Sequence, residues 1–279
     1  MNLIADSGST ETKWALTDGA KLVKYIRTQG INPFFQKMEE ITTLIQETLL
    51  PELPPDLKIG QIWFYGAGCA FADKNKVLEN ALTKLFPSCN VEINSDLLGV
   101  CRGMLGKRRG VACILGTGSN SCLYDGDNIE EHVSPLGFIL GDEGSGADLG
   151  KRLVSDCLKN QLPGDLTEKF LVFAQDSPAD ILDHVYRQSC PNRYLASLSR
   201  FLIENIEEPE CYDIVHSAFR DFFERNILQY EFPDELPVNF AGSIAYYYRD
   251  ILEKVASEYG FWIEKIEKSP LEGLIHYHS

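Results

Sequence analysis

The chain has 279 residues, of which 44% are hydrophobic and 24% charged, which is enough for one large domain or two moderate domains with a stable core. Its 26 basic and 41 acidic residues give a net charge of −15; nucleic acid binding requires a basic surface, so we expect no nucleic acid partner. The sequence contains neither a signal-type N-terminus nor an apolar run long enough for a membrane span, and we expect a cytoplasmic protein with no membrane partner.

Short apolar runs joined by Ser/Gly or Asp-Gly turns open the chain, and they predict three strands, at residues 2–9, 12–19 and 20–28. The pattern then alternates between helix and strand, ending in a helix, over residues 36–50, 61–68, 74–86, 91–96 and 97–105. In the first of these helices Ile41, Leu44 and Ile45 fall on one face. The first part of the chain therefore has the order βββαβαβα.

The same pattern starts again near residue 110. Two strands at 110–119 and 120–133 are followed by helical stretches across roughly 146–230. The remaining elements are a strand, a helix, a strand and a closing helix, at residues 237–243, 244–260, 261–268 and 269–278. This weak internal duplication predicts an α/β protein of two lobes facing each other across a cleft, with a helical insertion in the second. We expect lobes at 1–105 and 106–267, with the closing helix, 268–279, packing back on the first.

Four Gly-rich turns each follow an apolar, strand-like run: "DSGST" (6–10), "GTGS" (116–119), "GDEGSG" (141–146) and "AGS" (241–243). Small residues allow backbone N–H groups to converge on an anion, and Ser and Thr add hydroxyl donors. Any one of these turns is typical of an ordinary hairpin. The four together, two at equivalent places in a duplicated unit, indicate phosphate binding without the P-loop pattern, which the sequence lacks.

The order of "DSGST", "INSD", "GTGSNS", "GDEGSG" and "AGS" resembles the actin-like superfamily of sugar kinases and Hsp70 ATPases, whose lobes are ribonuclease H-like. Within it, the chain resembles the N-acetylglucosamine kinase branch of the BadF/BadG/BcrA/BcrD ATPases over essentially its whole length. The resemblance implies an ATP- and Mg²⁺-dependent kinase that phosphorylates a hydroxyl, O6, of N-acetylglucosamine or a related amino sugar. It also implies a homodimer.

The resemblance assigns residues as well. Asp6 would bind Mg²⁺, and Asp96 would be the catalytic base that takes the proton of the sugar hydroxyl. The residues implied for ATP are Ser7, Gly8, Ser9, Thr10, Lys13, Gly116, Thr117, Gly118, Gly242 and Ser243. Those implied for the sugar are Asn32, Asn120, Asp142 and Gly144. Asp142 is favoured over Glu143 because adjacent side chains point in different directions.

Other interpretations of these residues remain open. Taken alone, Asp96 is more typical of a helix N-cap, and Asp6 and Asn32 are also typical of turns. Leu136-Gly137-Phe138 stands where the family has its usual aromatic residue, so N-acetylmuramate or glucosamine is also compatible with the pattern. The triplet Tyr246-Tyr247-Tyr248 is more typical of core packing than of a base-stacking platform.

Two rival functions share this fold. A dehydratase activator would hold an iron–sulfur cluster at a dimer interface, and Cys101 is a candidate ligand for it. However, the eight cysteines are scattered singly, which favours buried thiols. A nucleotide-dependent scaffold would instead hydrolyse ATP independently of any sugar.

Overall fold

The computed structural model describes residues 1–55, 57–231 and 236–279. The chain divides into two compact units. The first unit comprises Met1–Ala112, Tyr124–Glu130 and Ser269–Ser279, and the second comprises Cys113–Leu123 and Glu131–Lys268. The lobe boundaries predicted from the sequence, after residues 105 and 267, stay predictions.

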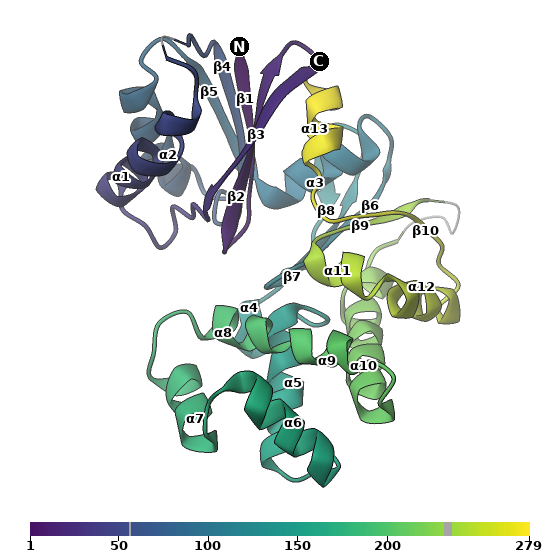
Figure 1. The fold of residues 1–279 in the computed structure, drawn as a ribbon. Coiled ribbons are helices and arrows are strands. Elements are labelled where there is room, and N and C mark those ends of the chain that lie inside the picture. The colour runs from purple at the N-terminus through teal and green to yellow at the C-terminus, as the bar shows by residue number, and fades with distance from the viewer. Residues whose placement is uncertain (56, 232–235) are drawn as a thin grey trace. The chain divides into compact units, whose positions relative to one another are not determined.

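The first half of the chain follows the predicted order of elements (Figure 1). These are β1 (Asn2–Ser7), β2 (Glu11–Asp18), β3 (Lys21–Gln29), α1 (Met38–Thr48), the short 3-10 helix η1 (Leu50–Glu52), β4 (Gln61–Gly66), α2 (Ala72–Leu85), β5 (Asn90–Ser95) and α3 (Asp96–Leu105). The strands form one five-stranded sheet in the order β3-β2-β1-β4-β5. Strand β1 is antiparallel to β2 and parallel to β4, and β4 is parallel to β5.

Helices cover both faces of this sheet, because successive side chains of each strand point to opposite faces. Figure 1 shows α1 and α2 on one face, and α3 with the C-terminal helix α13 (Leu271–Tyr277) on the other. Leu3 and Trp14 belong to the core under α1 and α2. Ile4, the next residue of β1, packs instead with Leu274 of α13. The residues of β1 that continue this alternation, Asp6 and Ser7, therefore face different sides of the sheet.

The second half contains the other sheet and a large helical insertion (Figure 1). Its elements up to the insertion's end are β6 (Gly110–Leu115), β7 (Ser119–Tyr124), β8 (Ile129–Glu131), α4 (Gly137–Leu140), α5 (Gly146–Leu158), α6 (Gly164–Ala174), α7 (Pro178–Tyr186), α8 (Pro191–Leu198), α9 (Arg200–Glu204), α10 (Pro209–Arg225) and η2 (Ile227–Gln229). They are followed by β9 (Val238–Ala241), α11 (Ser243–Tyr247), α12 (Arg249–Glu258) and β10 (Ile263–Glu267). The five strands are ordered β10-β9-β6-β7-β8. Two α/β halves of βββαβαβα type, the second enlarged by helices, confirm the predicted fold class.

Three local predictions were wrong. The single strand predicted at 120–133 is two strands, β7 and β8. The apolar run before "GDEGSG" is not a strand but the single-turn helix α4, which begins where Leu136 and Gly137 adopt positive φ angles of 61° and 76°. Its Ile139 and Leu140 side chains are 75% and 71% exposed, so the run has no core face to pack against. The predicted helix at 244–260 is broken in two, at Tyr248.

The tyrosine triplet lies at this break: Tyr246 and Tyr247 end α11, and Tyr248 separates it from α12. Only Tyr248 is buried, and its hydroxyl donates a hydrogen bond of 2.6 Å to the carbonyl oxygen of Ser199. Tyr246 and Tyr247 are 39% and 52% exposed. Core packing was therefore the correct prediction for one of the three residues, because a helix turns only part of its surface to the core.

Gly150 of α5 provides a test of the insertion's packing. A Cβ atom added there would lie 1.9 Å from the carbonyl oxygen of Leu195 in α8, so the two helices must move apart to accommodate it. We expect Gly150→Ala to lower the free energy of unfolding, measured in urea, by about 1–3 kcal/mol. Gly164→Ala in α6 is the matched control, because a Cβ there meets no atom within 4 Å. Equal stability of the two variants would contradict this packing.

Candidate functional site

Two predicted carboxylates lie at the carboxyl-terminal edge of the first sheet. Strands β1, β4 and β5 are parallel, and their final residues Ser7, Gly66 and Ser95 are register partners in a row. Asp6 precedes the first of these residues, and Asp96 follows the last as the first residue of α3. This edge is where open α/β sheets bind their ligands.

Asp96 is not the N-cap of α3. That position belongs to Ser95, whose Oγ accepts a hydrogen bond of 3.2 Å from the backbone N–H of Leu98. The Asp96 carboxylate accepts a bond of 2.9 Å from the backbone N–H of Leu97 through Oδ1. The alternative interpretation of Asp96 was that it caps the helix, and this capping role belongs to its neighbour Ser95.

Both carboxyl groups are held in an environment that disfavours their charged forms. Burial raises the pKa of Asp96 to about 6, and the nearby negative charge of Asp6 adds to this rise, while the Leu97 N–H opposes it. Burial also raises the pKa of Asp6, against the opposing effects of the Ser269 hydroxyl and the Lys13 ammonium. Two partly buried carboxylates that repel each other form a site in which a cation is favourable.

This pair fits the chemistry of Mg²⁺, a cation that is bound through one or two carboxylates and otherwise keeps waters and substrate phosphate oxygens. Within the described residues there is no cluster of three or more His, Cys, Asp or Glu side chains arranged for a metal ion. The described residues thus contain no metal site made of protein side chains of these types alone. Asp6 is the carboxylate that would hold Mg²⁺, with the carboxylate of Asp96 nearby.

The glycine turn after β1 is open to solvent. Gly8 donates its N–H to the carbonyl oxygen of Glu11 at 2.9 Å, and Gly8 and Thr10 are exposed. Gly30 packs beneath the turn, since a Cβ there would lie 2.6 Å from the Gly8 carbonyl oxygen. Lys13 lies opposite Asp6 in the β1–β2 register, so its ammonium approaches the same edge.

Ser7 differs from the rest of this turn. Its side chain is fully buried, and its Oγ lies 2.7 Å from the Thr12 hydroxyl and donates to the carbonyl oxygen of Ile31 at 2.9 Å. The Ile31 N–H in turn donates to the same Oγ. The Ser7 hydroxyl thus ties three chain segments together, and we do not include it in the ATP site proposed below.

Asn32 forms the turn that the sequence left open as its alternative role. It is 7% exposed, and its Oδ1 accepts a hydrogen bond of 2.9 Å from the backbone N–H of Phe34, which is an Asx turn. Gly68 lies close by with a φ of 79°, and a Cβ there would collide with this oxygen. A role of Asn32 in sugar binding stays a prediction.

In the second unit, the turns "GTGS" and "GDEGSG" are joined directly. The N–H of Gly146 donates to the carbonyl oxygen of Gly116 at 2.8 Å, and that of Ala147 donates to Thr117 at 3.1 Å. Asp142 Oδ1 accepts a bond of 3.3 Å from the Ser119 N–H. The stretch 141–146 is therefore a buried support of the second glycine loop, not a solvated surface turn.

Asp142 and Glu143 differ as predicted for adjacent side chains. Asp142 has a φ of 54° and is 9% exposed, and burial raises its pKa to about 6, with the Glu143 charge adding to the rise and the Ser119 N–H opposing it. Glu143 lies 3.4 Å from Arg225 and lines a cavity of about 340 Å³ with apolar side chains that include Val133 and Pro135. The two acids therefore occupy separate environments.

The raised pKa of Asp142 predicts a pH-dependent gain of stability in Asp142→Asn. A carboxyl group whose folded pKa exceeds its unfolded pKa of 3.8 destabilises the fold increasingly as the pH rises from 3.8 to about 6, and fully above that. The amide is neutral and its oxygen can still accept from Ser119. We expect unfolding in urea at pH 7.5 to require about 2 kcal/mol more than for the wild type. At about pH 3, below both pKa values, the difference should be nearly absent; a gain of equal size at both pH values would contradict this electrostatic origin.

The remaining predicted residues of this unit have structural partners as well. Asn120 Oδ1 accepts from the Ser121 N–H at 3.0 Å and lies 2.9 Å from His132 Nε2. Gly144 has a φ of 70° and its N–H donates to Asp148 at 3.2 Å. Gly242 has a φ of 121°, and a Cβ would lie 2.2 Å from the Leu115 carbonyl oxygen. The "AGS" turn, where Ser243 begins α11, thus lies against the strand that leads into "GTGS".

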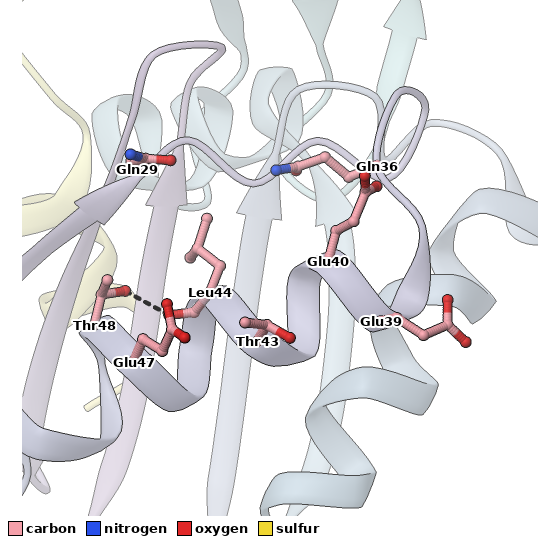
Figure 2. A pocket seen from close by; sticks show the side chains of 8 residues that line it. All are labelled: Gln29, Gln36, Glu39, Glu40, Thr43, Leu44, Glu47 and Thr48. Carbon is pink, nitrogen blue, oxygen red and sulfur yellow. Dashed lines mark hydrogen bonds between the residues drawn. The ribbon is translucent and has the colours of Figure 1, made fainter.

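The structure contains a further cavity, of about 530 Å³, along α1 (Figure 2). Figure 2 shows its lining side chains, which include Glu39, Glu40 and Glu47. None of the predicted site residues lines it, and three carboxylates would repel a triphosphate. We therefore do not place the nucleotide there.

Sequence reasoning missed two polar residues that contact predicted site residues, one in each unit. Ser269 Oγ donates a hydrogen bond of 2.5 Å to Asp6 Oδ2, although its sequence context, Lys-Ser-Pro, indicated only a helix start. Asp148, 3% exposed, pairs with Lys151 and Arg152 beneath the "GDEGSG" turn. Its position at the third residue of α5 is typical of an ordinary acidic first turn, so no local signal distinguished it.

The rival dehydratase activator finds no support at Cys101. This thiol lies within α3 and is fully buried, whereas a cluster shared between chains needs ligands at the surface. In the part of the chain that the structure describes, no helix is both long and apolar enough to cross a membrane.

Comparisons with known proteins agree with this architecture, although no protein-family model matches the chain. A crystal structure from Porphyromonas gingivalis, provisionally named an N-acetylglucosamine kinase, is 44% identical with a TM-score of 0.96, covering 100% of this chain and 98% of that one. A ROK family glucokinase from Streptomyces griseus, crystallised with glucose and AMPPNP, has a TM-score of 0.60 at 13% identity, covering 99% of this chain and 97% of that one. This second likeness shows the fold alone.

Among curated proteins, the N-acetylmuramic acid/N-acetylglucosamine kinase of Clostridium acetobutylicum is 27% identical over 177 residues. The match covers 58% of this chain and 56% of that protein, so the chain spans about half the length of this relative. Assignment to the BadF/BadG branch in particular stays a prediction. From its fold and its full-length likeness to the Porphyromonas gingivalis structure, the chain belongs to the family of actin-like sugar kinases.

Proposed function

We propose that the protein transfers the γ-phosphoryl group of ATP to a hydroxyl, O6, of N-acetylglucosamine or a closely related amino sugar. The observation that carries the proposal is the carboxylate pair Asp6 and Asp96 at the carboxyl edge of β1, β4 and β5, with Asp96 relieved of the capping role. The named activities of the relatives in Porphyromonas and Clostridium support the choice of an amino sugar.

In this mechanism Asp96 accepts the proton of the attacking sugar hydroxyl, so that the oxygen is a better nucleophile as it meets the γ-phosphorus. A pKa of about 6 leaves Asp96 ionised at neutral pH and yet basic enough to take the proton. When bound at Asp6, Mg²⁺ would neutralise charge on the phosphate oxygens. The turns at residues 8–10 and 116–118 would provide backbone N–H groups for the phosphates, other than those of Gly8 and Gly116, which donate within their own turns.

For the sugar, we propose Asp142 as an acceptor of hydroxyl hydrogen bonds, with Asn32 and Asn120 as further candidates and Gly144 shaping the turn. A buried carboxylate that loses its partner hydroxyl is costly, which gives such a site its selectivity. Gly242 and Ser243 would lie against the adenosine. The homodimer is expected from the family resemblance and the cytoplasmic location from the N-terminal sequence and the lack of a long apolar run; both stay predictions.

A coupled assay of ATP consumption with N-acetylglucosamine, N-acetylmuramate and glucosamine tests the proposal. We expect ATP turnover that requires Mg²⁺ and is strongly stimulated by at least one of these sugars, with mass spectrometry and NMR locating the phosphate on O6. Sugar phosphorylation by Asp96→Asn should be nearly absent. ATP hydrolysis that is independent of every sugar would contradict the proposal and favour a nucleotide-dependent scaffold.

A further inference from the structure

We propose that Ser269 is a positioning residue for this kinase reaction: it holds the Asp6 carboxylate in the orientation that binds Mg²⁺. The C-terminal helix α13 would thereby be part of the catalytic apparatus and not only a cover for the sheet. This inference rests on the proposed function, because it assigns Asp6 to the metal.

The contact itself is short and directional. Ser269 Oγ donates to Asp6 Oδ2 at 2.5 Å, across 263 residues of sequence. The same Oγ accepts from the backbone N–H of Leu271 at 3.4 Å, which directs the hydroxyl hydrogen toward the carboxylate. A donor on one carboxylate oxygen fixes the side-chain rotamer and leaves the other oxygen to face a ligand. Hydrogen bonds of this kind orient metal ligands in proteins.

Helix α13 is docked firmly enough to hold Ser269 in place. Leu271 and Leu274 are 4% and 0% exposed and pack in one cluster with Ile4 and Tyr65. Ile4 lies two residues before Asp6 on the same face of β1, so the hydrophobic contact and the Ser269 bond follow each other along one strand. Beyond the helix, the His278 ring is stacked on Trp63 with centroids 4.0 Å apart.

Helix α13 also fixes the helix that carries Asp96. Gly273 of α13 and Gly103 of α3 are in backbone contact, since a Cβ on Gly273 would lie 1.8 Å from the Gly103 carbonyl oxygen. A Cβ on Gly103 would lie 2.6 Å from the Pro270 carbonyl oxygen. The two helices therefore position both carboxylates. Ser269, two residues before α13, holds Asp6, and Asp96 is the first residue of α3.

The test compares Ser269→Ala and Ser269→Thr with the wild type, using calorimetric affinity for ADP with Mg²⁺ and for ADP in EDTA, together with kcat and KM. We expect Ser269→Ala to weaken binding of ADP with Mg²⁺ about tenfold and to lower kcat about tenfold. Affinity for metal-free ADP and the KM of the sugar should not change, and Ser269→Thr should restore both losses because it keeps the hydroxyl. Ser279→Ala is the matched control, since its Oγ donates to the His276 carbonyl oxygen at 2.7 Å near the chain's end.

Wild-type affinity and kcat in Ser269→Ala would overturn the inference. So would an equal loss of affinity for ADP with and without Mg²⁺, accompanied by a lower melting temperature, because that pattern describes a structural role. If the wild type binds ADP with Mg²⁺ but phosphorylates no amino sugar, the proposed function fails, whereas the effect of Ser269 is still read from the two affinities.

Discussion

Replacing Asp96 with asparagine is expected to lower kcat for sugar phosphorylation by about 10²- to 10⁴-fold, the usual contribution of a general base. Asparagine can hydrogen-bond the sugar hydroxyl but cannot take its proton. Because substrate contacts are kept, the KM values for sugar and ATP should stay close to those of the wild type. Steady-state kinetics at saturating Mg²⁺ measures this split between kcat and KM.

The fold should tolerate this exchange. Ser95, not Asp96, caps α3, and the pKa of Asp96 is raised to about 6, so that removing its charge relieves a cost of burial. Ser95→Ala serves as the opposite control: it should lower the free energy of unfolding by about 1 kcal/mol with a much smaller effect on kcat. If folded Asp96→Asn protein phosphorylates the sugar at a near-normal rate, Asp96 is not the base.

The elements of the first half were predictable because their signals are local. Short apolar runs and Gly-containing turns specify β1 to β3, and helical periodicity specifies α1. The placement of Asp96 at a strand–helix junction could also be predicted. The strand-like run "VEINSD" ends at this residue, and the helical run begins directly after it.

The features that could not be predicted from the sequence depend on tertiary contacts, which no local pattern encodes. Ser269 and Asp6 are 263 residues apart, and their bond exists only because α13 returns to the first sheet. The buried hydrogen bonds of the Ser7 hydroxyl were not predicted either, because they depend on strand alternation, which turns this hydroxyl to the core while Asp6 faces the other side. Likewise, the apolar residues of α4 suggested a strand, although they are exposed.

Asp142→Ala tests the site in the second unit. If Asp142 accepts a hydrogen bond from a sugar hydroxyl, losing this charged acceptor costs about 1.5–3 kcal/mol, and the KM of the sugar should rise about 10- to 150-fold. The KM of ATP should change far less. Glu143→Ala is the matched neighbour, and we expect a smaller effect from it because Glu143 faces Arg225.

The structure supplies a competing role for Asp142 that the same kinetics can separate. Its Oδ1 accepts from Ser119, and its Oδ2 would lie 2.9 Å from a Cβ placed on Gly118, so the carboxylate also supports the "GTGS" loop. If this support is its main role, Asp142→Ala should raise the KM of ATP at least as much as that of the sugar. Asp142→Asn keeps an acceptor for Ser119 but loses the charge. A raised sugar KM with unchanged ATP KM in Asp142→Asn would therefore assign the carboxylate to the sugar.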